Sequence, residues 1–185
     1  MIEFIKSTHT YLVDGVVVPS VTQIMKQASD DTYCGIPEEV LIKAAERGTA
    51  VHEGICEYDT TKRISADCPI DYLDRYLNLK VKTQLEPMRQ EFILCATVGI
   101  TFAGTIDMLA KIGGKTALID IKTSSAKHVD LWSIQLAGYD ELLRENGVVV
   151  DEHYILHLTS KTAKLISIIP DYKKWNEYKS EQSLW

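Results

Sequence analysis

Two runs of alternating apolar and polar residues, joined by the pair Gly113-Gly114, constrain the fold of this chain more than any other stretch. The runs cover about residues 101–112 and 115–122. Two extended runs separated by Gly-Gly predict a β-hairpin, because glycine accepts the backbone torsions of a tight turn. Asp107 and Asp120 each stand six or seven residues from this turn. Strand pairing should therefore bring both carboxylates to the same end of the hairpin.

The motif Asp120-Ile121-Lys122 adds a lysine to this end. Side chains alternate between the two faces of a strand, so the carboxylate and the ammonium share a face. Two carboxylates that hold a hard divalent cation, beside a lysine that stabilises charge on a phosphate or an attacking water, fit phosphodiester hydrolysis. Aspartates beside turns and a lysine at a strand end are also ordinary surface features. The hairpin alone leaves both interpretations open.

The length and composition indicate one globular domain with a core of its own, since the chain has 185 residues, 45% hydrophobic and 25% charged. No apolar run approaches the ~20 residues of a membrane span. The first residues, Met1–Lys6, lack the basic start and apolar stretch of a signal peptide. We therefore expect a cytoplasmic protein without a membrane partner.

The cysteines and the net charge argue against two classes of protein. Cys34, Cys56, Cys68 and Cys95 are scattered without a C-x-x-C pair, which predicts reduced thiols rather than structural zinc. A net charge of -6 argues against a protein that coats DNA nonspecifically. It does not exclude a nuclease, because bound cations offset the charge of metal-binding carboxylates.

The N-terminal third is expected to form a small hairpin followed by helices. Asp14-Gly15 is the expected turn between strands at 11–13 and 16–18. The spacing of Ser20 and Gln23 fits a capping box, which predicts a helix from Val21 to about Ala28 and a polar loop from Ser29 to Tyr33. A long helix over about 37–58 should follow. Its apolar stripe has Gly48 at the centre, which suggests close packing there, and consists of Val40, Ala44, Val51 and Ile55.

The rest of the chain alternates strands and helices, which indicates a mixed α/β fold. The expected elements are a helix at about 71–85 closed by Pro87, strands at about 89–96, 101–112, 115–122, 152–158 and 161–169, a helix at about 130–145 with Asp130 as its N-cap, and a helical tail at 171–185. Glu91 would be either another carboxylate of the site or a solvated strand-end residue. The loop residues Lys127 and His128 are placed to meet a phosphate.

Two further groups of side chains are candidates for the site. His52 lies beside the apolar stripe of the long helix, where a metal ligand and a core or surface histidine are both plausible. Trp132, Gln135 and Tyr139 are three and four residues apart and share a helical face. An indole, an amide and a phenol together suit a partly buried polar site better than a simple core.

Four ordered motifs resemble those of RecB-like nucleases in the PD-(D/E)xK superfamily. They are Arg47-Gly-Thr-Ala-Val-His52, Gly104-Thr-Ile-Asp107, Asp120-Ile-Lys122 and Gln135-Leu-Ala-Gly-Tyr139, and they span residues 47–139. The resemblance implies a restriction-endonuclease-like core, a central mixed β-sheet flanked by helices. It implies one nuclease domain over 1–185, with an N-terminal hairpin and helix at 1–36, the nuclease core at 37–160, and a C-terminal strand and helix at 161–185.

The resemblance also assigns roles. Mg²⁺ or Mn²⁺ would be held by His52, Asp107, Asp120 and the carbonyl of Ile121, and Glu53, about 100° around the helix from His52, is the weaker ligand candidate. Lys122 would assist the water and the transition state. Catalysis would involve Asp107, Asp120, Lys122, Gln135 and Tyr139, and the nucleic acid would contact Gln135, Tyr139, Trp132 and Lys127.

The resulting hypothesis is a metal-dependent DNA nuclease, an exonuclease of the size of small phage or mobile-element enzymes of recombination and repair. No cysteine follows Cys95, so we expect no iron–sulfur cluster. Gly113-Gly-Lys115 lacks the spacing of a helicase phosphate loop. The alternatives are a catalytically silent module that binds nucleic acid or a partner, and a nuclease subunit that needs a recombination or single-strand-binding partner. Strand preference, polarity and oligomeric state stay open.

Overall fold

The computed structural model describes residues 1–182, so the last part of the expected helical tail, 183–185, lies outside the described residues. The elements are β1 (Ile2–Ile5), β2 (Thr10–Val13), β3 (Val16–Val18), α1 (Val21–Ile24), α2 (Lys26–Tyr33), α3 (Glu38–Thr61), α4 (Ile70–Thr83), β4 (Glu86–Ala96), β5 (Phe102–Ile112), β6 (Lys115–Lys122), α5 (Val129–Glu145), β7 (Glu152–Leu158), β8 (Ala163–Ser167) and α6 (Tyr172–Glu181).

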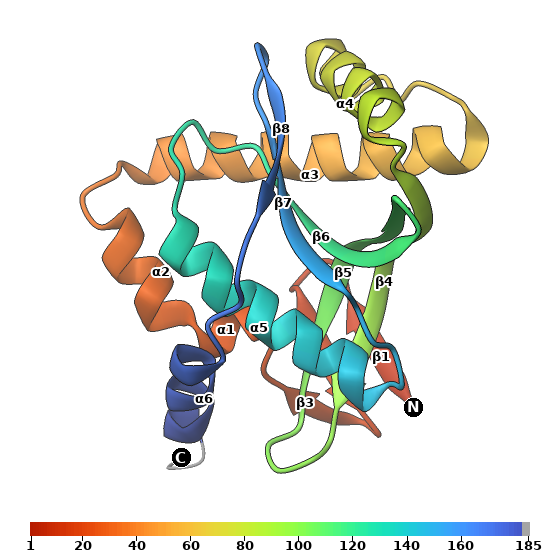
Figure 1. Ribbon diagram of the computed structural model, residues 1–185. Coiled ribbons are helices and arrows are strands. Elements are labelled where there is room, and N and C mark those ends of the chain that lie inside the picture. The colour runs from red at the N-terminus through yellow and green to blue at the C-terminus, as the bar shows by residue number, and fades with distance from the viewer. Residues whose placement is uncertain (183–185) are drawn as a thin grey trace.

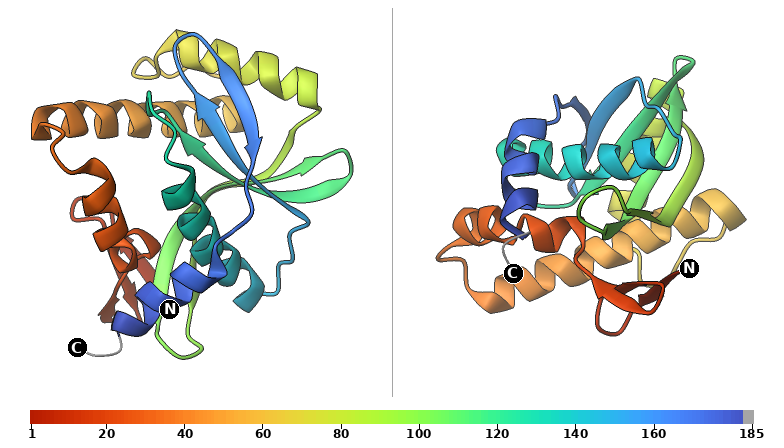
Figure 2. Two further views of the ribbon diagram at one scale, coloured as in Figure 1. Left: turned by 60° about the vertical axis from the view of Figure 1, so that its left-hand side comes forward. Right: turned by 90° about the horizontal axis from the view of Figure 1, so that it is seen from below.

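A five-stranded sheet in the order β4-β5-β6-β7-β8 forms the centre of the fold (Figure 1). The β6–β7 pair is parallel and the other pairs are antiparallel, so the sheet is mixed. Helices α3 and α4 pack on one face and α5 on the other (Figure 2). The predicted α/β fold, a central mixed sheet flanked by helices, is therefore confirmed.

The predicted hairpin forms with its turn at Gly113-Gly114. Met108 to Ile112 of β5 pair with Lys115 to Ile119 of β6. Both glycines have positive φ, 56° and 83°, as a two-residue turn between twisted strands requires. In β6, Leu118 joins the core on the α5 face, while Ile119 joins the core under α3 and α4. This alternation directs Asp120 and Lys122 to the same side as Leu118.

The N-terminal hairpin forms a separate three-stranded sheet, β1-β2-β3, against the edge of the main sheet. Two contacts attach it to β5. The Tyr11 hydroxyl lies 2.8 Å from Thr105 Oγ1, and the Ala103 N–H donates to the carbonyl of Pro19 at 3.0 Å. This sheet is therefore fixed next to the strand that carries Asp107.

The expected loop at Ser29–Tyr33 is wrong, because these residues belong to α2. The capping box of Ser20 and Gln23 does start α1, but the helix breaks at Met25, where φ is -92° and ψ is 18°. The chain then resumes a helix, supported by the i,i+4 ion pair of Lys26 with Asp30. The polar composition resembled a loop because this helix has no buried residue.

Smaller differences concern element ends. Pro87 does not close the preceding helix: α4 ends at Thr83, and Pro87 lies within β4 at a register shift. Proline is tolerated there because β4 is an edge strand, where a missing N–H breaks no ladder bond. The N-cap of α5 is His128, and Asp130 lies in the first turn.

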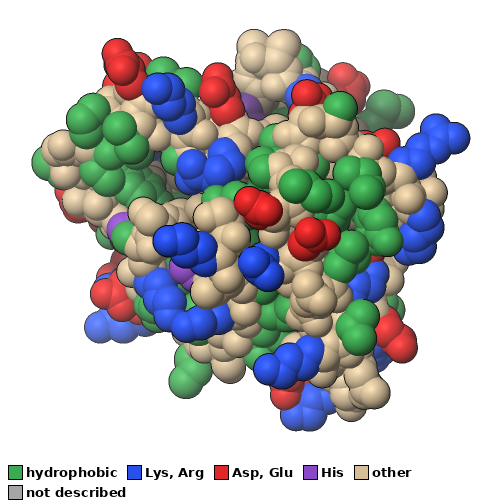
Figure 3. All heavy atoms as spheres, turned by 90° about the horizontal axis from the view of Figure 1, so that it is seen from above, with side chains coloured by type: hydrophobic (Ala, Val, Ile, Leu, Met, Phe, Trp, Pro, Cys, Tyr) green, Lys and Arg blue, Asp and Glu red, His purple; other side chains and the backbone are tan. Residues whose placement is uncertain are grey.

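Only the C-terminal half of α3 is buried. Val51 and Ile55 are fully covered, whereas Val40 is 53% exposed. The stripe predicted from Val40 onward thus packs only where the helix crosses the sheet. The face viewed in Figure 3 carries hydrophobic side chains in separate groups among charged ones. No helix within residues 1–182 combines the length and apolarity needed to cross a bilayer.

The closely packed glycine of α3 is Gly54 rather than the predicted Gly48. A methyl group at position 54 would lie 2.3 Å from the Cβ of Cys68, whereas one at position 48 would meet Thr123 Oγ1 at an ordinary 3.6 Å. Gly54→Ala should therefore lower the free energy of unfolding by about 1–3 kcal/mol through overpacking. Gly48→Ala, the matched control, should raise it by up to about 1 kcal/mol through helix propensity.

Denaturant midpoints of the two variants measure this difference, provided that the slopes agree with wild type. Equal midpoints would show that the contact between α3 and Cys68 is not tight.

Asp140 anchors α5 to β7 and α6. Its carboxylate, 3% exposed, accepts hydrogen bonds from the Tyr172 hydroxyl (2.7 Å) and His153 Nε2 (3.0 Å) and pairs with Arg144 Nε (2.8 Å). Burial raises its pKa, but these partners outweigh burial and hold the pKa below the usual 3.8. The folded chain therefore stabilises the charged form of the Asp140 carboxylate more than the unfolded chain does.

This lowered pKa predicts a contribution to stability that is complete above the unfolded-state pKa and lost as the pH falls through the folded-state pKa. Asp140→Asn should therefore reduce the loss of unfolding free energy between about pH 5 and pH 3. Urea denaturation across this range tests it. Asp74→Asn, at an exposed position of α4, is the control and should follow wild type.

Candidate active site

A cavity of about 410 Å³ opens between the central sheet, the N-terminal sheet, α3 and α5. Its floor comes from β4, β5 and β6, and its walls from the other elements. The polar lining residues of the floor and of α5 are Glu91, Thr105, Asp107, Asp120, Lys122, Gln135 and Tyr139. His52 enters from α3. Every residue predicted as catalytic thus lies in one cavity.

Asp107 is fixed where the β5–β6 ladder ends. The last paired residues are Met108 and Ile119, and one step further Asp107 stands opposite Asp120. The N–H of Ile121 donates to Asp107 Oδ2 at 2.7 Å, which replaces the missing ladder bond. This bond sets the orientation of the carboxylate, which is 8% exposed.

Asp120, which is buried, and Lys122, which is partly buried, form an ion pair. Lys122 Nζ lies 2.7 Å from Asp120 Oδ2, as the shared strand face predicted. Asp120 is 1% exposed, and within the described residues this oxygen has no partner in directed hydrogen-bond geometry. The pair is therefore held by charge, and the oxygen retains a lone pair that faces the site.

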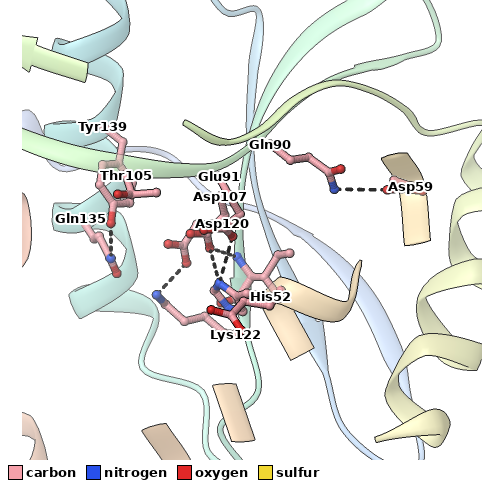
Figure 4. A network of polar contacts seen from close by, with 12 residues as sticks. His52, Asp59, Gln90, Glu91, Thr105, Asp107, Asp120, Lys122, Gln135 and Tyr139 are labelled. Atoms are coloured by element: carbon pink, nitrogen blue, oxygen red, sulfur yellow. Dashed lines mark hydrogen bonds and ion pairs between the residues drawn. The ribbon is translucent and has the colours of Figure 1, made fainter. Parts of the chain in front are cut away.

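His52 reaches the floor from α3 (Figure 4). Its Nε2 lies 2.9 Å from the carbonyl oxygen of Ile121, and its Nδ1 lies 3.6 Å from both Glu91 Oε1 and Asp107 Oδ2. One donor atom each of His52, Glu91 and Asp107 falls within 4.8 Å of the others, so these three residues are placed to hold a metal ion. The structure thus gathers Glu91 with the predicted ligands and turns Asp120 toward Lys122.

The sequence alone does not identify Glu91 as part of the site. It lies between the pairs Gln90↔Met108 and Phe92↔Ile106, so it stands opposite Asp107 on the neighbouring strand. Its φ of 46° is unusual for a residue other than glycine. The register of β4 against β5, had it been known, would have identified this residue.

The positive and negative groups of the floor shift one another's pKa values. Burial disfavours the charged form of His52, but Asp107 and Glu91 outweigh burial and raise its pKa well above 6.5. Burial likewise opposes the lowered pKa of Asp107, which His52 and Lys122 produce. Burial raises the pKa of Asp120 to about 6, with Asp107 adding to the rise and Lys122 opposing it. The floor therefore favours any further positive charge.

Gln135 and Tyr139 form the α5 wall, as their shared helical face predicted. Gln135 Nε2 donates to the Tyr139 hydroxyl at 3.0 Å. Burial, together with Asp120 and Asp107, raises the pKa of Tyr139 well above 10, so its hydroxyl stays protonated. Both side chains are thus fixed hydrogen-bonding groups beside the acidic floor.

Trp132 and Lys127 lie outside the cavity. Trp132 is 1% exposed, and its ring packs 5.7 Å from that of His157, so it has no surface to offer a nucleic acid. The proposed contact of Trp132 is therefore wrong: the α5 face turns into the core one turn before Gln135. Lys127 is exposed on the loop before α5 and is not among the lining residues.

Comparison with known families identifies the chain. The family profile of the PD-(D/E)XK nuclease superfamily matches residues 57–181. The chain belongs to this superfamily. Its central sheet, with the aspartates and the lysine at the end of the β5–β6 hairpin, is the fold expected of a superfamily whose members hydrolyse phosphodiester bonds.

Two solved structures are similar to this member of the superfamily. One, named SSO0001, shares 16% identity, with a TM-score of 0.42, 87% of this chain covered and 84% of the other. The second, described as a putative exonuclease from Eubacterium rectale, shares 17% identity, with a TM-score of 0.44, 89% of this chain covered and 64% of the other. No curated protein matches the sequence significantly.

Glu91 provides a direct test of the metal cluster. Glu91→Gln should weaken Mn²⁺ binding by about tenfold or more, because even an outer-shell partner of a metal site carries that much affinity. Glu57→Gln removes an exposed carboxylate from α3 and is the matched control. Isothermal titration calorimetry gives both affinities. An unchanged Mn²⁺ affinity of Glu91→Gln would show that Glu91 is a solvated residue at the strand end and not part of the metal cluster.

Proposed function

We propose that the protein is a divalent-metal-dependent deoxyribonuclease that acts as an exonuclease, and that residues 1–185 form one nuclease domain. The observation that carries the proposal is the common cavity of the His52, Glu91 and Asp107 cluster and the Asp120–Lys122 pair. DNA as substrate and the exonuclease mode rest on the resemblance of the motifs to RecB-like nucleases.

The donor set fits a hard divalent ion. Carboxylate oxygens suit Mg²⁺ and Mn²⁺, and one imidazole favours Mn²⁺. The alternating charges of the floor and the unmet lone pair of Asp120 Oδ2 agree with a site that takes a cation. His52, Glu91 and Asp107 would hold it, and Asp120 lines the same cavity. The Ile121 carbonyl, expected as a further ligand, instead faces His52 Nε2 at 2.9 Å. When bound, the ion lowers the pKa of water and polarises the phosphate.

Lys122 assists the water and the negative charge that grows on the phosphate. Its ammonium is held by Asp120, and although burial lowers its pKa, Asp120 and Asp107 outweigh burial and raise it. It therefore remains charged and acts as a fixed positive group rather than a base. A preorganised charge of this kind stabilises the transition state more than the ground state.

Gln135 and Tyr139 orient the strand. The Tyr139 hydroxyl accepts from the Gln135 amide, which leaves the phenolic proton free to donate to a phosphate or sugar oxygen. Both groups are more than nine-tenths buried, so a substrate meets them already in place.

A cleavage assay tests this function. End-labelled linear DNA, single strands and covalently closed circles would be incubated with Mn²⁺ or Mg²⁺, with EDTA as the blank. We expect metal-dependent loss of linear DNA, intact circles, and a fall in kcat of about 10³-fold for Lys122→Met, which removes one transition-state contact in a dry site. Asp120→Asn should also be inactive.

The controls separate chemistry from folding. Lys122→Met leaves Asp120 buried without its partner, so its unfolding midpoint must be checked, and its Mn²⁺ affinity should be retained. Cutting of closed circles would make the protein an endonuclease. DNA binding without cleavage would favour the silent module, or a subunit that needs a recombination or single-strand-binding partner.

A further inference from the structure

The mouth of the cavity is built by the N-terminal sheet, which the nuclease mechanism does not use. Phe4, Lys6, His9 and Tyr11 line this side of the cavity. Lys6 and His9 belong to the turn between β1 and β2, which the N–H of His9 closes by donating to the carbonyl of Lys6 at 3.3 Å. The sheet lies beside β4, and Lys6 reaches Glu53 of α3 (Figure 2).

The turn has a rigid support. The Phe4 and Tyr11 rings stack at 4.7 Å, and the His9 ring packs edge-on against both, at 5.2 and 5.6 Å. Tyr11 is 2% exposed and bonds Thr105, two residues before Asp107. A φ of 50° at His9 completes the turn. The backbone at Lys6 is thus held at a defined place relative to the floor of the cavity.

Lys6 is the lysine of this cavity whose partner is exposed. Two lysines and no arginine line it, and Lys122 is already paired with the buried Asp120. Lys6 pairs with Glu53 of α3 at 2.5 Å, across the mouth, and the two side chains are 77% and 51% exposed. An exposed ion pair contributes little stability. A phosphate group can therefore replace the Glu53 carboxylate without a large loss.

We propose that Lys6 is a substrate-positioning residue that exchanges Glu53 for a backbone phosphate of the strand entering the cavity. The Glu53 carboxylate competes with the strand for the Lys6 ammonium and repels the phosphates of the strand. This inference rests on the proposed function, since it requires a nucleic acid strand in this cavity. Because the floor is acidic and the chain has a net charge of -6, a positive side chain at the mouth is needed to attract the negatively charged strand.

Variants of the two partners test the proposal, because phosphate exchange and a merely structural role of the pair predict different signs for the changes in DNA affinity. If the ion pair only stabilises the fold, Lys6→Ala and Glu53→Gln should have the same effect. If Lys6 binds a phosphate, Lys6→Ala weakens DNA binding, whereas Glu53→Gln strengthens it. Lys26→Ala removes a lysine from another exposed pair, with Asp30 on α2, and is the matched control.

Binding of a labelled single-stranded oligodeoxynucleotide would be measured by fluorescence anisotropy with Mn²⁺, with all variants built on Lys122→Met so that cleavage does not intervene. We expect about a fivefold weaker Kd for Lys6→Ala, as for one exposed charged contact, and a salt slope lower by about one. Glu53→Gln should tighten binding about twofold by the loss of one repulsive charge, Lys6→Arg should restore it, and Lys26→Ala should leave it unchanged.

Cleavage kinetics in the otherwise unaltered protein give a second readout. Lys6→Ala should raise KM by a similar factor and leave kcat within about twofold, because a contact remote from the reacting phosphate binds ground and transition states alike. Equal effects of Lys6→Ala and Lys26→Ala, or the same sign for Lys6→Ala and Glu53→Gln, overturn the proposal while cleavage persists. Absence of any DNA binding overturns the proposed function as well.

Discussion

The hydrogen bond from the Ile121 N–H to Asp107 Oδ2 connects the fold to the site. It lies where the β5–β6 ladder stops, so a backbone donor that would otherwise be unsatisfied in the interior finds a carboxylate. The carbonyl of the same residue accepts from His52 of α3. The backbone of Ile121 therefore fixes an aspartate of one strand and a histidine of a distant helix, and the register set by Gly113-Gly114 determines where Ile121 lies.

The cost of burying charge explains why the other residues take the positions they do. An isolated buried carboxylate is strongly unfavourable, whereas a paired one is tolerated. In the floor each negative group has a positive neighbour: Asp120 has Lys122, and Asp107 and Glu91 share His52. Two carboxylates on one imidazole leave an excess of negative charge. The site thus has a physical reason to take a cation, independent of any family resemblance.

Sequence alone predicted the parts that local chemistry decides. The Gly-Gly turn, the capping box of Ser20 and the shared face of Asp120 and Lys122 depend on residues close in the chain, and all three are confirmed. The missed features depend on distant partners. Gly54 is tightly packed because Cys68 returns from a later loop, and Glu91 meets Asp107 only through the β4–β5 register.

The face of α5 shows the same limit. The spacing of Trp132, Gln135 and Tyr139 correctly groups them on one side of a helix, but periodicity does not say where along that side the core ends and the cavity begins. The fold draws this boundary between Trp132, 1% exposed against His157, and Gln135.

The division of charge between floor and mouth separates two tasks. Lys122 is partly buried and paired with the buried Asp120, so in the proposed mechanism its fixed charge would act where negative charge develops in the transition state. Lys6 is exposed and weakly held by Glu53, so it can change partners as a strand arrives. An acidic protein that concentrated all of its positive charge on the floor would stabilise the reaction but attract its substrate poorly. With a second lysine on a braced turn, strand capture and phosphate chemistry can each be altered without the other.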